Sequence, residues 1–141
     1  MISVLYLLLT MVLGMQVKGS DGGVVASEAE DGLFPSKVTI EMTNFIQKQH
    51  LIVHCKDKKH DLGAQIINTG ETYSFVVTPN AFAKVTLYFC KFYFASSSYY
   101  FDIYRQDRDD CPDHGCYWDI FENGPCKINL RSRQCFSWNG N

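Results

Sequence analysis

The residues with the clearest chemistry in this chain are its six cysteines, all of which lie after an apolar N-terminal segment. They are Cys55, Cys90, Cys111, Cys116, Cys126 and Cys135. Thiols in this number can form disulfides, bind a metal or take part in redox reactions, and the cellular compartment decides among these fates. The apolar segment indicates export to an oxidising compartment. The sequence therefore predicts a protein stabilised by disulfides.

The apolar segment covers residues 2–17 and is followed at once by Lys18, Ser20 and Asp21. A membrane-spanning helix needs about 20 apolar residues, and this run is shorter. We expect a signal peptide over residues 1–19, cleaved before Ser20, with residues 24–26 as a second candidate site and an uncleaved anchor as the alternative. The protein is then secreted to the extracellular space and has no stable membrane insertion after cleavage.

Other side chains could hold metals. Asp107, Asp109, Asp110 and Asp113 could bind calcium, but their spacing differs from an EF-hand loop, and neighbouring arginines can neutralise them. The segment from Cys111 to Cys116 resembles half of a zinc site without a second half, and a secreted chain would oxidise it. We expect no metal and no cofactor.

Histidine pairs can perform acid–base chemistry, and the chain has His50, His54, His60 and His114. No ribonuclease motif surrounds any of the four. Asp102, an acid within an aromatic strand, is expected to face solvent or to bond to a nearby arginine or turn amide. We therefore expect no enzyme. The formal net charge of −2 lacks the basic excess of a nucleic-acid-binding protein, so no nucleic-acid partner is expected.

The elements that would position these residues are short strands. Residues 20–34 are rich in Gly, Ser, Asp and Glu and indicate a flexible acidic arm, so the folded domain is expected over residues 35–141. Period-two alternation, β-branched and aromatic runs and turn residues predict strands near 38–43, 51–55, 72–78, 85–94, 99–104, 116–121 and 126–130. The run 85–94 is expected at the centre of a sheet, with both faces against protein. The fold class is all-β, a small antiparallel β-sandwich of about seven to eight strands.

Several short motifs occur in a characteristic order along the predicted strands. They are Val53-His54-Cys55-Lys56, Asp61-Leu62-Gly63, Gly70-Glu71-Thr72-Tyr73-Ser74-Phe75, Thr86-Leu87-Tyr88-Phe89-Cys90, Phe101-Asp102-Ile103-Tyr104, Arg108-Asp109, Cys116-Tyr117-Trp118 and Gly124-Pro125-Cys126. The set resembles the plant self-incompatibility protein S1 family over about residues 37–130. The resemblance implies a secreted β-sandwich with four shared cysteines, here Cys55, Cys90, Cys116 and Cys126. The best understood members, in poppies, are stigma-secreted ligands of a pollen surface receptor, whereas most relatives have no established role.

The pairing of the six cysteines is a separate hypothesis. In the chain-entropy model a bridge that closes a longer loop stabilises more. We expect bridges from Cys55 to Cys126, from Cys90 to Cys116 and from Cys111 to Cys135.

The expected function is a non-enzymatic extracellular signalling ligand whose loops bind a plasma-membrane receptor or another extracellular protein. The loop residues expected to bind are Lys56, Asp57, Lys58, Lys59, His60, Asp61, Asp107, Arg108, Asp109 and Asp110. The alternative is a carbohydrate- or small-ligand-binding sandwich that uses exposed rings as stacking platforms, with Tyr99, Tyr100, Tyr117 and Trp138 as candidates.

Overall fold

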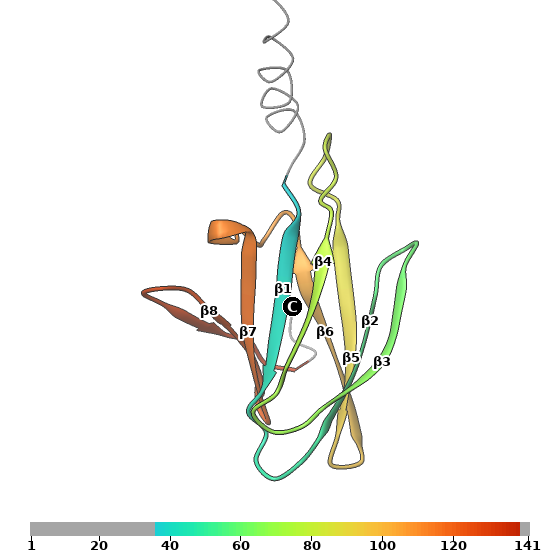
Figure 1. Cartoon of the computed structure of the whole chain (residues 1–141), viewed down its shortest axis with the longest axis vertical. Helices are drawn as coiled ribbons and strands as arrows, with labels where there is room; N and C mark the ends of the chain where they lie inside the picture. Colours follow the sequence, from blue (N-terminus) through green and yellow to red (C-terminus); the bar gives the residue numbers. More distant parts are fainter. Residues whose placement is uncertain (1–35, 139–141) are drawn as a thin grey trace, which may run out of the picture. The chain divides into compact units, whose positions relative to one another are not determined.

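The structure is a computed structural model that describes residues 36–138 (Figure 1). The expected signal peptide (1–19) and acidic arm (20–34) lie outside the described residues. Between Ser36 and Trp138, no helix has the length and hydropathy needed to cross a membrane.

Two β-sheets make up the described part of the chain, which confirms the all-β class (Figure 1). The first sheet has the strand order β4-β1-β7-β8-β9. Its strands are β4 (Thr72–Val77), β1 (Val38–Asn44), β7 (Gly115–Phe121), β8 (Gly124–Ile128) and β9 (Arg133–Cys135). The second sheet has the order β3-β2-β5-β6. Its strands are β3 (Asp61–Ile67), β2 (Leu51–Lys56), β5 (Leu87–Phe94) and β6 (Ser97–Arg105).

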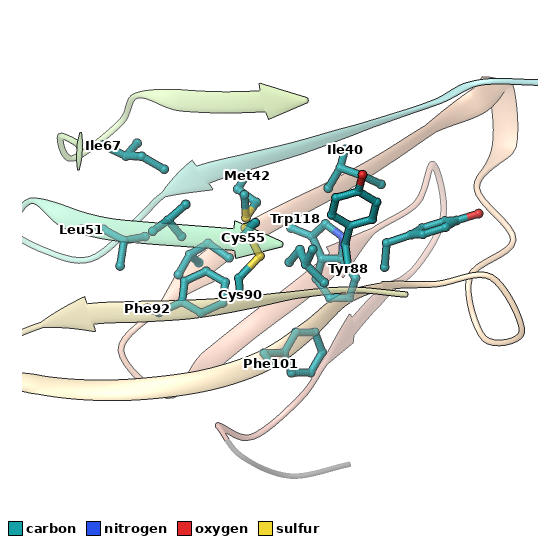
Figure 2. Close-up of a cluster of buried hydrophobic side chains, with 14 of the residues drawn as sticks. Ile40, Met42, Leu51, Cys55, Ile67, Tyr88, Cys90, Phe92, Phe101 and Trp118 are labelled. Carbon is teal, nitrogen blue, oxygen red and sulfur yellow. A yellow bond between two sulfur atoms is a disulfide. The ribbon is translucent and has the colours of Figure 1, made fainter. Parts of the chain in front are cut away.

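The core lies between the two sheets. Every second residue of β1, from Val38 to Asn44, is buried, as the period-two alternation of the sequence predicts. Figure 2 shows the strands of both sheets contributing side chains to this cluster, among them Ile40, Leu51, Phe92 and Trp118. Removing this apolar surface from water is the main force that holds the sheets together.

Strand β5 lies inside its sheet, between β2 and β6, as expected for the run 85–94. The expectation that both of its faces contact protein was wrong. Tyr88, Cys90, Phe92 and Phe94 are buried, whereas alternate residues such as Lys91 are exposed. Aromatic composition alone does not distinguish a strand buried on two faces from one that carries rings on an open face.

One strand pair departs from the antiparallel arrangement. β1 pairs with β4 in antiparallel fashion on one side and with β7 in parallel on the other. A parallel pair needs a long connection, and here the chain passes through the whole second sheet between β1 and β7. A short 3₁₀ turn, η2 (Pro112–His114), precedes β7.

The β5–β6 hairpin turns through only Ala95 and Ser96, whose φ angles are 49° and 61°. Positive φ at both central residues is typical of the type I′ turn that suits the right-handed twist of two strands. In the β7–β8 hairpin, Gly124 has φ of 143°, and a Cβ there would lie 1.9 Å from the carbonyl oxygen of Phe136. Glycine is therefore required at that position because the C-terminal segment passes directly against it.

All six cysteines are in disulfides, but the expected pairing was wrong. The bridges join Cys55 to Cys90, Cys111 to Cys116 and Cys126 to Cys135. The first joins directly opposed residues of β2 and β5, and the third joins directly opposed residues of β8 and β9. Strand register decides which thiols meet in the folded chain, whereas the entropy of loop closure concerns only the unfolded chain.

Candidate functional site

Three loops lie at the same end of the sandwich, opposite the β5–β6 hairpin (Figure 1). We call them the end loops: the β2–β3 loop (57–60), the β4–β5 loop (78–86) and the β6–β7 loop (106–114). Two of them contain most of the residues expected to bind a receptor. The third, β4–β5, was not among the expected sites.

The β2–β3 loop is organised by the carboxylate of Asp57, whose side chain is 20% exposed. Asp57 accepts hydrogen bonds from the backbone N–H groups of Lys59 and His60, and its carboxylate lies 3.1 Å from Nδ1 of His60. Burial opposes ionisation, but these hydrogen bonds lower the pKa of Asp57 to about 2. A single anionic side chain therefore fixes the loop and leaves Lys58, Lys59 and His60 exposed.

Tyr88, Asp61 and Lys56 lie at the base of this loop. Burial and the charge of Asp57 raise the pKa of Tyr88 to about 12. Asp61, the first residue of β3, contacts Nε2 of His54 and accepts a hydrogen bond from the Gly63 amide. Those contacts hold the pKa of Asp61 below its ordinary value. Lys56 ends β2 and is exposed on the outer face of its sheet.

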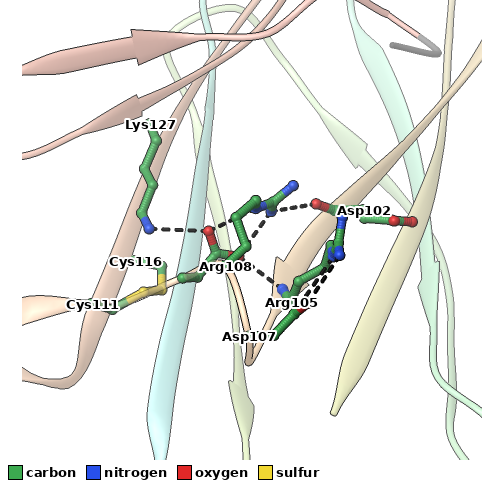
Figure 3. Close-up of polar contacts among 8 residues, drawn as sticks. Asp102, Arg105, Asp107, Arg108, Cys111, Cys116 and Lys127 are labelled. Atoms are coloured by element: carbon green, nitrogen blue, oxygen red, sulfur yellow. Dashed lines mark hydrogen bonds and ion pairs between the residues drawn. A yellow bond between two sulfur atoms is a disulfide. The ribbon is translucent and has the colours of Figure 1, made fainter. Parts of the chain in front are cut away.

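The β6–β7 loop is anchored by Asp109, whose side chain is only 1% exposed. Figure 3 shows the polar contacts of this region, with Arg105, Arg108 and Lys127 labelled. Arg108 donates to both of its carboxylate oxygens, at 2.9 and 2.8 Å, and the Arg105 amide donates at 2.8 Å. Nζ of Lys127, itself only 8% exposed, lies 3.1 Å from Oδ1. Burial would raise the pKa of Asp109, but these partners hold it below its ordinary value.

Arg108 also contacts aromatic rings. Its Cζ lies 5.2 Å from the ring centroid of Phe101, 5.6 Å from Trp118 and 5.3 Å from Phe136. Its Nη2 donates to the carbonyl oxygen of Asp102 at 2.7 Å. A guanidinium held over several rings and paired with a buried carboxylate is a structural anchor. Arg108 and Asp109 thus hold the loop; the Asp109 side chain is buried, and that of Arg108 is 23% exposed.

The outer part of the β6–β7 loop is acidic and exposed. Asp107 pairs with Arg105 at 3.0 Å, and Asp110 and Asp113 are exposed. The disulfide between Cys111 and Cys116 closes this segment around η2.

The β4–β5 loop presents Phe82, which is 93% exposed. Asn80 forms the turn beneath it by accepting the N–H groups of Phe82 and Ala83 at 2.9 and 3.0 Å. Gln106 joins this loop to the acidic one, since its amide donates to the Asn80 carbonyl and accepts from the Asn80 and Thr86 amides. Sequence reasoning missed the loop because Phe82 stands alone, without a periodic pattern around it.

The four rings proposed as carbohydrate platforms are divided among different faces of the sandwich. Tyr99 and Trp138 are half-buried and stack on each other with centroids 5.1 Å apart. Tyr100, the next residue along β6, points to the opposite face of the strand from Tyr99 and is exposed. Tyr117 belongs to the other sheet. These four residues therefore do not form one stacking surface.

Within residues 36–138, no group of three or more His, Cys, Asp or Glu side chains is arranged to hold a metal ion. His54 and His60 each contact an aspartate, as described above, in separate places.

The fold and its end loops define a class: a small disulfide-bonded β-sandwich with constrained loops at one end. The family model for plant self-incompatibility protein S1 matches residues 39–138. The chain is 40% identical over 119 residues to S-protein homolog 2 of Arabidopsis thaliana, covering 77% of this chain and 73% of that relative. It is 35% identical to S-protein homolog 4 of the same plant over 98% of this chain and 90% of that relative. The chain belongs to the plant self-incompatibility protein S1 family.

A solved structure supports the fold. It is an SPH (self-incompatibility protein homologue) structure, from a family described as small, highly stable, secreted proteins from plants. The match has a TM-score of 0.57 at 15% identity and covers 73% of this chain and 95% of that one.

Proposed function

We propose that this chain is a secreted, non-enzymatic recognition protein that acts as a ligand for a plasma-membrane receptor. The proposal concerns recognition and does not extend to pollen rejection. Membership of the S1 family and the secreted character described for the structural neighbour support export. The observation that carries the ligand role is the set of three end loops, which are held in fixed conformations at one end of the sandwich.

Each end loop has its own constraint. The β2–β3 loop is held by Asp57, the β4–β5 loop by Asn80 and Gln106, and the β6–β7 loop by Asp109 and the Cys111–Cys116 disulfide. Loops that are already ordered lose little entropy on binding, so more of the contact energy appears as affinity.

The loops also differ in chemistry. The β2–β3 loop presents Lys58 and Lys59, the β6–β7 loop presents Asp110 and Asp113, and the β4–β5 loop presents the ring of Phe82. An exposed aromatic anchor among charges of both signs is typical of protein-binding surfaces, where the ring fills a pocket and the charges select the partner.

The test is capture of plasma-membrane proteins by the oxidised chain. We expect saturable enrichment of a protease-sensitive surface protein, and we expect the variant Cys111→Ala/Cys116→Ala, which frees the acidic loop, to bind more weakly. The fully reduced chain is the control for binding through unfolded segments. Capture by the reduced chain equal to that by the oxidised chain, or no saturable binding, would contradict the proposal.

A further inference from the structure

The outer face of the β3-β2-β5-β6 sheet carries a depression of about 290 Å³ that lies on strands and not on the end loops. Its lining comes from three adjacent strands. The lining residues are His54 and Lys56 of β2, Phe89 and Lys91 of β5, and Tyr100 of β6. All point away from the core, because they alternate with the buried residues of the same strands.

Strand register sets these side chains in a compact group. Lys91 lies opposite His54 on one side and opposite Tyr100 on the other, and Lys56 lies opposite Phe89. Nζ of Lys56 is 5.5 Å from the Phe89 ring centroid, and Nζ of Lys91 is 6.0 Å from that of Tyr100. The depression therefore holds two neighbouring pairs, each an ammonium group that lies over an aromatic ring.

The charge of this group is positive. Among the described residues, neither Lys56 nor Lys91 is within 4.0 Å of a carboxylate oxygen; Asp61, which lies opposite Lys56 in the register, is in contact with His54. Asp102 lies opposite Phe89 in the register and is absent from the lining. Two lysines concentrated in one hollow of an acidic protein, with a formal net charge of −2, favour an anionic ligand.

The aromatic rings indicate which kind of anionic ligand fits the depression. Tyr100 is 55% exposed, so much of its ring is accessible at the surface. A flat ring beside an ammonium group suits a ligand that has an apolar C–H face and a carboxylate on the same rigid unit. An acidic sugar has both features, whereas an aspartate or glutamate side chain has the carboxylate without the ring-shaped C–H face.

We propose that this depression binds carboxylated sugars of an acidic polysaccharide. The sugar carboxylate binds the ammonium groups of Lys91 and Lys56 and draws them away from the rings, and the pyranose C–H face packs on the exposed ring of Tyr100. The lining residues lie on strands, and Lys56 adjoins the β2–β3 loop; sugar binding there does not require the receptor-binding role of the end loops. A secreted protein with both surfaces can be retained on an acidic matrix while its loops remain available.

The test measures binding of the oxidised chain to an oligogalacturonate by isothermal titration calorimetry. The same oligosaccharide with its carboxylates methyl-esterified tests the charge, and poly-glutamate tests whether an acidic polypeptide suffices. The charge variant is Lys56→Gln/Lys91→Gln, and its matched control is Lys37→Gln/Lys48→Gln, which removes two exposed lysines outside the depression and the end loops. Tyr100→Leu removes the ring, and Tyr100→Phe keeps it. Circular dichroism confirms that each variant is folded.

We expect the oligogalacturonate to bind, and the charge variant and Tyr100→Leu each to weaken binding by about tenfold or more. The control double variant and Tyr100→Phe should bind like the unaltered chain, and the esterified sugar should bind weakly. Absence of binding, or equal loss in the two double variants, would overturn the proposal. Equal affinity for poly-glutamate, unaffected by Tyr100→Leu, would show a purely electrostatic site for polyanions and would overturn the sugar assignment.

Discussion

Asp109 is the residue on which the β6–β7 loop depends. Its carboxylate is buried and bound by Arg108, Lys127 and the Arg105 amide, so the loop, β6 and β8 are connected through one side chain. Burying charges is costly, and the attraction between them roughly offsets that cost. The network therefore fixes the geometry of the loop more than it adds to overall stability.

Removing this carboxylate should be costly, because Asp109→Asn leaves the nearly buried ammonium of Lys127 without its counter-charge. We expect the free energy of unfolding to fall by about 3–5 kcal/mol. Asp110→Asn, an exposed neighbour, is the control and should change it by less than about 0.5 kcal/mol. Urea denaturation measures both, and equal losses in the two variants would show that Asp109 does not anchor the loop.

Asp57 makes the stability of the fold sensitive to acid. Its pKa falls from 3.8 in the unfolded chain to about 2 in the folded one, so its contribution is complete above 3.8 and is lost as the pH falls toward 2. The variant Asp57→Asn should lose less folding stability than the unaltered chain as the pH falls from 3.8 toward 2. The variant Asp113→Asn should lose as much as the unaltered chain. Urea midpoints at a series of pH values measure the difference, and identical pH profiles for the two variants would contradict the assignment.

At the scale of elements, strands with regular alternation could be predicted and irregular ones could not. The alternation over residues 38–43 identified β1, whereas β3 contains Gly63, Ala64 and Gln65 and lies at a sheet edge, where little of it is buried. β9 has only three residues, too few for a period. The parallel pairing of β1 with β7 is set by contacts between segments far apart in the chain, which local patterns do not report.

For the end loops, the sequence predicted the exposure of some charged residues and not of others. Charged residues are usually exposed, and this holds for Lys58, Lys59 and Asp110. Arg108 and Asp109 are exceptions because they satisfy each other over a platform of rings that forms only when β6, β7 and the C-terminal segment meet.

The three disulfides should contribute unequally. The Cys55–Cys90 bridge spans 35 residues and the Cys111–Cys116 bridge spans 5. In the chain-entropy model these correspond to about 4 and about 2 kcal/mol. We expect Cys55→Ala/Cys90→Ala to lower the free energy of unfolding more than Cys111→Ala/Cys116→Ala does.

Urea denaturation of the two double variants measures the difference in their free energies of unfolding. Mass spectrometry of non-reduced peptides from the unaltered chain checks which cysteines are paired. A Cys55–Cys126 peptide would contradict the structure. A larger loss from the Cys111–Cys116 pair would show that this bridge does more than close its loop.

Over the described domain, the scaffold and the end loops are distinct parts of the fold. The two sheets and the strand-to-strand bridges form the scaffold, and the end loops project from one end of it (Figure 1). Such an arrangement lets loop sequences change while the core stays the same. This separation is consistent with an S1-family fold that is retained at low sequence identity in the solved SPH structure.

If the end loops form the binding surface, the exposed ring of Phe82 should contribute strongly to binding. Phe82 and Leu130 are 93% and 95% exposed, but only Phe82 lies in an end loop, since Leu130 lies in the β8–β9 turn. The measurement is saturable binding of the oxidised chain to plasma-membrane vesicles. Phe82→Ser should weaken it by about tenfold or more, while Leu130→Ser should leave it unchanged. Equal affinity of the two variants would contradict the claim.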